Sequence, residues 1–257
     1  METWRTAIVD AGPDHIRVRG HDVLELMKQA TFTDLIFLLH HQRLPLPAER
    51  RLVDAMLIGV ADHGAGAPSC AAARLAASGN RQSPSAAIAA GVLTIGDEHG
   101  GAGSGCMDVI AEGLRRAHAT GVTIDAAAQQ LVEEARAAKR RLPGFGHRVH
   151  ATIDPRVEVL FTMARESGLA GDGIRFARAL EAAIRERIKP LPLNIDGALA
   201  AVLVDLGFPA MVGRLLFIIG RVAGLSAEVL EECTREKPMR IKIPVHYDGV
   251  APVGSGR

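Results

Sequence analysis

Residues 143–149 read Pro-Gly-Phe-Gly-His-Arg-Val, and residues 154–156 read Asp-Pro-Arg. A charged helical pattern over 131–141 stops just before this stretch, and a second helix is predicted to begin at its end. Glycines on both sides of Phe145 allow a tight turn and a close approach of the backbone to a ligand. The stretch therefore predicts a sharp loop between two helices that directs His147 into a cleft. Taken alone, such a histidine is more often an ordinary surface residue.

Length and composition restrict the class of protein. A chain of 257 residues can form one sizeable core or two closely packed domains. Thirty basic and 29 acidic residues give a net charge of +1, so nothing favours binding to nucleic acid or to an anionic membrane. The three cysteines have no metal-ligand spacing and suit a reducing compartment. The N-terminus lacks the pattern of a secretion signal, and the most apolar run, 211–219, is too short and too charged to span a bilayer. We expect a cytoplasmic protein without a metal.

Hydrophobic periodicity predicts an all-α fold with at most a small β-hairpin, formed by 6–10 and 15–18. Beyond residue 237 the chain has no helical period and is predicted to be extended. Small apolar residues surround the whole circumference of 84–96, which predicts a helix packed on every side. Helices are predicted over 22–29, 33–41, the segment containing 52–60, from 68 onward, and over 84–96, 107–119, 124–140, 154–167, 173–188, 196–206 and 209–234, the last bent or interrupted at 220–224.

Glycine and proline breaks suggest two helical domains. The larger one is predicted to combine residues 1–104 with 194–257. The smaller one is predicted to contain residues 105–193, including the 143–149 loop. These boundaries follow only from where the breaks fall.

Residues 97–105 read Asp-Glu-His-Gly-Gly-Ala-Gly-Ser-Gly and open a helix. No Lys-Ser/Thr pair ends the run and no strand leads into it, so a nucleotide-binding loop is excluded. One interpretation is a flexible hinge with an incidental histidine. The other uses position: the dipole of a helix N-terminus disfavours an imidazolium, so His99 stays neutral and can donate a hydrogen bond to a developing oxyanion.

Two further motifs have both a structural and a chemical interpretation. Asp196 in Leu-Asn-Ile-Asp-Gly (193–197) can be a helix cap, the commoner role. A carboxylate withdrawn from water into a cleft is also a stronger base. His63, in Asp-His-Gly (62–64) at a helix C-terminus, can simply be favoured there by the helix dipole.

Together, these stretches resemble the citrate synthase superfamily. The 143–149 run followed by 154–156 is similar to the family's G-F-G-H-R-V and D-P-R, 99–102 to its H-G-G-A, and 194–196 to its N-V-D. The resemblance covers roughly residues 23–240, with the motifs in family order, which is far more specific than one short match. It implies an all-α, citrate synthase-like fold and a homodimer or larger homo-oligomer.

The resemblance also implies roles for single residues. His147 would handle a hydroxyl proton, His99 would hold the oxygen of a thioester enolate, and Asp196 would exchange a proton with carbon. Guanidinium groups pair with carboxylates through two parallel bonds, which suits a tricarboxylic substrate. Implied substrate-binding residues are His63, Arg156, Arg221 and Arg240, and implied residues for coenzyme A are Pro143, Gly144, Phe145, Gly146 and Asn194. No cofactor is implied beyond coenzyme A as part of the substrate.

One departure from the family pattern bears on the reaction. Asp196-Gly197 differs from the N-V-D-F of typical synthases and is closer to the citryl-CoA lyase module of ATP citrate lyase. The chain is also much shorter than ordinary citrate synthases. We therefore expect a citryl-CoA lyase that forms acetyl-CoA and oxaloacetate. The alternatives are a short citrate or 2-methylcitrate synthase and an inactive CoA-thioester-binding protein.

Overall fold

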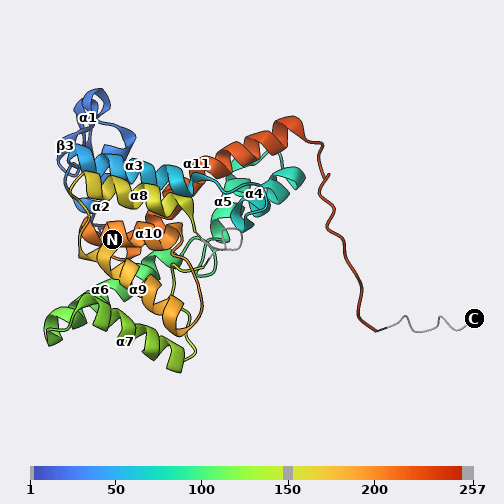
Figure 1. The fold of residues 1–257 in the computed structure, drawn as a ribbon. Coiled ribbons are helices and arrows are strands. Elements are labelled where there is room, and N and C mark those ends of the chain that lie inside the picture. Colours follow the sequence, from blue (N-terminus) through green and yellow to red (C-terminus); the bar gives the residue numbers. More distant parts are fainter. Residues whose placement is uncertain (1–2, 147–152, 251–257) are drawn as a thin grey trace, which may run out of the picture.

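The computed structural model describes residues 3–146 and 153–250 and confirms a mostly helical fold. Figure 1 shows the helices gathered into a body from which an extended C-terminal tail runs away. Within the described residues, the strands are β1 (Val9–Gly12), β2 (His15–Val18) and β3 (His21–Asp22), and the helices are α1 (Val23–Gln29), α2 (Phe32–His41), α3 (Pro47–Ala61), α4 (Pro68–Gly79), α5 (Pro84–Leu93), α6 (Ala102–Thr120), α7 (Ile124–Ala137), α8 (Pro155–Glu166), α9 (Asp172–Arg187), α10 (Ile195–Asp205) and α11 (Met211–Arg235).

The predicted hairpin is confirmed and extended by one short strand. β1 and β2 pair antiparallel, with Val9 opposite Val18 and Gly12 opposite His15. β3 then adds to β2 to give a three-stranded sheet of order β1-β2-β3. Gly20 makes this turn with φ of +85°, a conformation that favours glycine. A two-residue strand is too short for a period-2 pattern to reveal.

Local sequence signals define where several helices begin. Thr31 and Asp34 form a reciprocal capping box at the start of α2. Asp154 caps α8 by accepting the backbone N–H of Arg156. Proline occupies the first turn of α3, α4, α5 and α8, where its missing N–H costs no hydrogen bond.

Residues 102–105 of the predicted break at 100–105 are helical, and the predicted bend or interruption at 220–224 is not an interruption. α6 begins at Ala102, before the predicted start, and α11 is one uninterrupted helix from Met211 to Arg235. The glycines serve close packing: a Cβ on Gly213 would lie 2.8 Å from the carbonyl carbon of Gly103, and one on Gly224 would lie 2.0 Å from the oxygen of Ala61. The sequence predicts an interruption at these glycines, although glycine marks a close helix contact as readily as a break.

Buried apolar side chains form two clusters. The larger involves α2, α3 and α6 to α11 and includes Phe37, Phe161 and Phe176. The smaller lies between α4, α5 and the C-terminal half of α11, and most of its members are alanine. In Figure 1, α11 leads from the body to the α4–α5 pair. The division into domains at Gly105 and Leu193 stays a prediction.

In a single copy of the chain, the prediction that α5 is packed on every side is wrong. Only Ala87 and Gly91 of α5 are buried. Leu93 at its end is 84% exposed. One side of an apolar helix therefore faces outward.

None of the helices within the described ranges is long and apolar enough to cross a membrane.

Candidate active site

Ser69 joins His99 to Arg221 inside the protein. Its side chain is fully buried at the start of α4. Arg221 donates from Nη1 to Ser69 Oγ at 3.0 Å, and Ser69 Oγ lies 2.9 Å from His99 Nε2. The backbone N–H of Ser69 also points to Nε2, at 3.3 Å. A backbone N–H can only donate, so Nε2 is the acceptor, and Ser69 Oγ, which accepts from Arg221, donates its own hydrogen to Nε2. This pattern gives a neutral His99 with its hydrogen on Nδ1.

A tight turn sets His99 close to the first residues of α6. The amide groups of Gly96 and His99 exchange hydrogen bonds of 2.9 and 3.0 Å, and Gly101 N donates to Gly96 O at 2.9 Å. Gly100 has φ of +73°, and a Cβ there would lie 2.2 Å from the ring of Phe217. The turn thus excludes any larger residue after His99, and the histidine lies near the positive end of the helix, as predicted.

The loop at 143–146 pairs with the segment that leads to Asp196. Gly146 N donates to Pro192 O at 2.7 Å, and Asn194 N donates to Gly144 O at 3.0 Å. Asn194 Nδ2 adds a hydrogen bond of 2.8 Å to Gly146 O. Two motifs that are far apart in the chain are therefore held together, mostly by backbone contacts. His147, the next residue of the loop, lies outside the described residues.

Glycine at position 197 permits this pairing. A Cβ on Gly197 would lie 2.5 Å from Gly144 O. A Cβ on Gly144 would lie 2.8 Å from Gly197 Cα and 2.8 Å from Cys106 Sγ. The Asp-Gly sequence thus has a physical role here, because α10 begins directly against the loop.

Asp196 is not the cap of α10. Asn194 is the N-cap residue, and its Oδ1 accepts the backbone N–H of Gly197 at 3.1 Å. The cap interpretation of Asp196 is therefore wrong, and Asn194 has that structural role. Burial raises the pKa of Asp196 to about 6, although the charges of Arg156 and Arg221 act to lower it. A carboxyl group with this pKa can exchange a proton near neutral pH.

Arg156 lies beside Asp196 but is already paired. Its Nε donates to Asp154 Oδ1 at 2.9 Å and its Nη2 to Asp154 Oδ2 at 2.8 Å. Its Nη1 donates to the carbonyl of Gly59 at 2.9 Å. Sequence reasoning quoted Asp154 only as part of Asp-Pro-Arg, and it missed Ser69 as a partner of His99. The available signal for Asp154 was its position as a capping aspartate before proline.

Arg221 is buried in the middle of α11. Its Nε donates to Val60 O at 2.9 Å, and its guanidinium stacks on Phe217 with 4.9 Å between Cζ and the ring centroid. These contacts bring a predicted substrate-binding cation to the same place as His99. Its charge also acts on Asp196.

One predicted site residue, Arg240, lies apart from this group. Arg240 is held at the C-terminal end of α11 by Glu232, with Nε 3.1 Å from Oε1. Glu232 is eleven residues beyond Arg221, about 16 Å along a helix. His63 is exposed, just after the end of α3. The chain therefore brings His99, Arg156, Asn194, Asp196 and Arg221 together with the loop at 143–146, and leaves Arg240 away from them.

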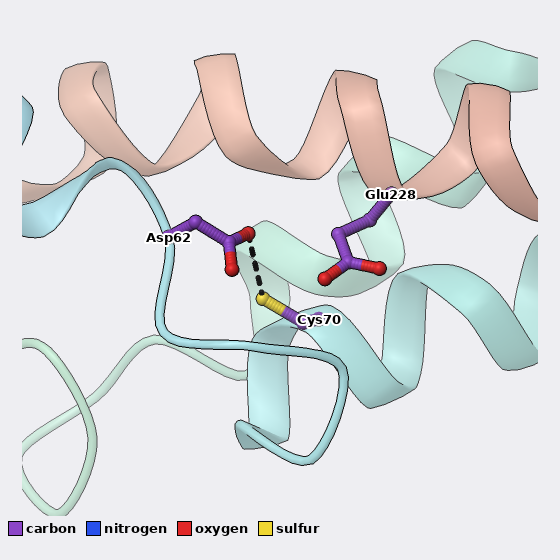
Figure 2. Close-up of side chains that lie close together, drawn as sticks. All are labelled: Asp62, Cys70 and Glu228. Atoms are coloured by element: carbon purple, nitrogen blue, oxygen red, sulfur yellow. Dashed lines mark hydrogen bonds between the residues drawn. The ribbon is translucent and has the colours of Figure 1, made fainter.

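A cluster of possible metal ligands includes Cys70, the residue that follows Ser69 in the chain (Figure 2). Asp62, Cys70 and Glu228 have ligand atoms within 4.8 Å of one another. The thiol of Cys70 donates to Asp62 Oδ2 at 3.5 Å, and burial, with the charge of Asp62, raises its pKa. Arg74 donates to Glu228 at 2.5 Å. A metal needs a thiolate, whereas this environment favours the thiol. The cluster is best described as a hydrogen-bonded group.

A cavity of about 340 Å³ opens between α3 and α8. Arg156 and Ile195 line it, together with apolar side chains that include Ile58 and Val159. It therefore lies next to Arg156 and next to the start of α10.

Known proteins resemble this chain in sequence and in structure. Residues 45–242 match the family described as citrate synthase, C-terminal domain. The citryl-CoA lyase from Hydrogenobacter thermophilus is 37% identical, with a TM-score of 0.88 over 98% of this chain and 97% of that one. The glyoxysomal citrate synthase of Cucurbita maxima is 31% identical over 193 residues, which are 71% of this chain and 35% of that protein.

A more distant structure has the same fold. The ATP citrate lyase of Methanosaeta concilii, solved with (3S)-citryl-CoA, is 22% identical, with a TM-score of 0.79 over 96% of this chain and 42% of that one. The chain spans 35% and 51% of the length of two curated relatives, the Cucurbita enzyme and a putative citrate synthase of Mycobacterium bovis.

Proposed function

Because the chain belongs to the citrate synthase family, we propose that it cleaves citryl-CoA to acetyl-CoA and oxaloacetate by a retro-aldol-type step. The observation that carries the proposal is the arrangement of the site: Ser69 connects His99 to Arg221, whose charge acts on the carboxyl group of Asp196. The likeness to a citryl-CoA lyase over nearly the whole length of both chains favours cleavage over condensation.

The proposed reaction uses one base, one oxyanion donor and one acid. His147 takes the proton of the tertiary hydroxyl as the carbon–carbon bond breaks, and oxaloacetate forms with its new ketone. The electron pair of that bond passes to the thioester as an enolate, whose oxygen His99 stabilises through Nδ1–H. Protonated Asp196 then gives its proton to the enolate carbon, which yields acetyl-CoA. Proton transfers of this kind contribute about 10²–10⁴-fold each, and an oxyanion donor about 10²–10³-fold.

Substrate binding is proposed for two groups of residues. Arg156 and Arg221 supply positive charge beside Asp196, which suits the carboxylates of the citryl group. His63 and Arg240 are proposed for the same carboxylates, with Arg240 acting in the site of a second copy. Pro143, Gly144, Phe145, Gly146 and Asn194 form the paired loop that we propose for coenzyme A, since glycine backbones allow close approach of a ligand.

A second copy of the chain is the proposed partner of the outward side of α5. Ala86, Ala89 and Leu93 are exposed there although the helix is apolar all round. Small side chains allow two helices to approach closely, so this face is suited to pairing with its own copy across a two-fold axis. Met211, Leu215 and Val222 on α11 are exposed apolar residues as well. All three cysteines are unpaired, which fits a reducing compartment such as the cytoplasm.

The test is direct. Purified protein is incubated with (3S)-citryl-CoA, and oxaloacetate is measured by its reduction with malate dehydrogenase. We expect oxaloacetate to form, with kcat reduced about 10²–10⁴-fold in Asp196→Asn, which keeps the size of the side chain but holds no transferable proton. Intact citryl-CoA after prolonged incubation would rule out the lyase.

The same preparation separates the other candidates. Condensation, as in citrate synthase or 2-methylcitrate synthase, is the second candidate, and the similar Cucurbita protein is a citrate synthase. Release of CoA from acetyl-CoA or propionyl-CoA with oxaloacetate, faster than cleavage of citryl-CoA, would make the protein a synthase. Thioester binding without either reaction would leave an inactive binding protein.

A further inference from the structure

Asp154 connects three helices around Asp196, and the proposed reaction does not use it. Its side chain is fully buried. It accepts two hydrogen bonds from the guanidinium of Arg156, and its Oδ2 also accepts the backbone N–H of Ile195 at 3.1 Å. Arg156 in turn donates to Gly59 O. One carboxylate therefore links the start of α8, the start of α10 and, through Arg156, the last turns of α3.

We propose that Asp154 is a positioning residue: it holds Arg156 in a fixed pair beside Asp196 and secures the helix start that carries Asp196. The inference rests on the proposed function, in which Asp196 is the proton donor to carbon. The physical basis is that the carboxylates of Asp154 and Asp196 compete for the guanidinium of Arg156. With both Nε and Nη2 bound to Asp154, Arg156 is prevented from forming the same bidentate pair with Asp196.

The charges around Asp196 make the consequence definite. The groups that act on its pKa include Arg156 on α8, Arg221 on α11 and Asp154 before α8. The thiol of Cys106 on α6 is a neighbouring titratable group, and His99 belongs to the same site. Burial raises the pKa of that thiol to about 12, so it stays uncharged at neutral pH. The arginines lower the pKa of Asp196, and Asp154 raises it.

Loss of the charge on Asp154 therefore has two effects, and both lower the pKa of Asp196. It removes an anion that opposes ionisation of Asp196, and it leaves Arg156 without its counter-charge. Both favour the ionised form of Asp196. The proposed acid would then be deprotonated over most of the working pH range.

Asp154→Asn tests this in the full-length chain, because asparagine also caps helices and has nearly the same shape. The pH midpoint of the titration of the Asp196 carboxyl group is measured by ¹³C NMR of the side-chain carboxyl groups. The signal of Asp196 is the one that is missing in Asp196→Asn. We expect the midpoint to fall by about one pH unit or more. An unchanged midpoint would overturn the proposal. Asp205→Asn is the matched control: Asp205 accepts backbone N–H groups of Gly171, Gly173 and Ile174, and its loss should leave the midpoint of Asp196 where it was.

A double variant tests whether the effect passes through Arg156. In Asp154→Asn with Arg156→Gln, the guanidinium that Asp154 would have released is absent. Most of the downward shift in the titration midpoint of Asp196 should therefore vanish. A full shift in the double variant would mean that Asp154 acts only by its own charge, and positioning would be refuted. If Asp154→Asn does not fold, Arg156→Gln alone should raise the midpoint, and no rise would also refute it.

This readout does not depend on turnover. If wild-type protein leaves citryl-CoA intact, the proposed function fails while the NMR midpoint still tests the role of Asp154. If citryl-CoA is cleaved and the midpoint of Asp154→Asn is unchanged, only the role of Asp154 fails.

Discussion

At the scale of single residues, Asp196 links chemistry to stability. Its pKa of about 6 in the folded protein lies above the ordinary value of 3.8, mainly because of burial. Between these two values the folded state holds more protons than the unfolded state, so the free energy of unfolding falls as pH rises. A group suited to proton transfer near neutrality thus destabilises the fold at that pH.

Asp196→Asn should therefore be the more stable protein at neutral pH. The increase in the free energy of unfolding over wild type should be small at pH 4 and should reach at most about 3 kcal/mol by pH 7. One pKa unit corresponds to about 1.4 kcal/mol. Urea unfolding of both proteins at several pH values measures it. A stability difference that does not change with pH would contradict the raised pKa.

Ser69 should matter through His99 rather than through packing. Ser69→Ala removes a donor to His99 Nε2 and the acceptor of Arg221 Nη1, so the imidazole loses a contact that selects its tautomer. We expect kcat to fall about 10–100-fold, equivalent to roughly 1–3 kcal/mol for an unsatisfied buried group. Ser78→Ala is the control, because Ser78 is buried on the same helix and its Oγ has no hydrogen-bond partner among the described residues. Equal effects of the two substitutions would argue for packing alone.

At the scale of secondary structure, the decisive contact is between the loop at 143–146 and the start of α10. Three hydrogen bonds join these segments. Their backbones lie so close at Gly144 and Gly197 that neither position has room for a side chain. The loop is predicted to carry the thioester, and α10 carries Asp196. Their spacing therefore determines whether the proton donor reaches the enolate carbon.

Gly197→Ala should push these two segments apart. The added methyl would lie 2.5 Å from Gly144 O, and relief requires a backbone shift that costs about 1–3 kcal/mol. We expect a lower melting temperature and a loss of activity greater than that loss of stability explains. Gly66→Ala, where a Cβ meets nothing within 4 Å, should change neither. Wild-type activity in Gly197→Ala would show that the contact tolerates displacement.

At the scale of the whole molecule, the exposed side of α5 predicts self-association. Leu93→Glu places a charge on that apolar surface and should shift the protein toward a monomer, measured by sedimentation velocity over a range of concentrations. Ile58→Glu is the control, because Ile58 is equally apolar and 77% exposed but lies at the cavity between α3 and α8. A wild-type protein that sediments as a fully active monomer would remove the basis for a shared site.

Much of this protein can be predicted from its sequence alone, because the signals are local. Helix periods, proline at first turns, capping residues and breaks at glycine and proline act over a few residues. They therefore predict the helical fold, the hairpin and the sharp loop that begins at residue 143. The sequence motifs also identify candidate residues such as His99 and Asp196. They do not reveal which partner each residue meets.

The tertiary structure decided those partners. Ser69 reaches His99 across 30 positions and Asp154 reaches Ile195 across 41, and no periodicity encodes such contacts. Whether Asp196 is a cap or a titrating acid depends on burial and on charges contributed by α8 and α11, so only the assembled chain selects between them. Glycine is ambiguous for the same reason: at 197 and 224 it is required by a neighbouring backbone, and that neighbour exists only after the helices have packed.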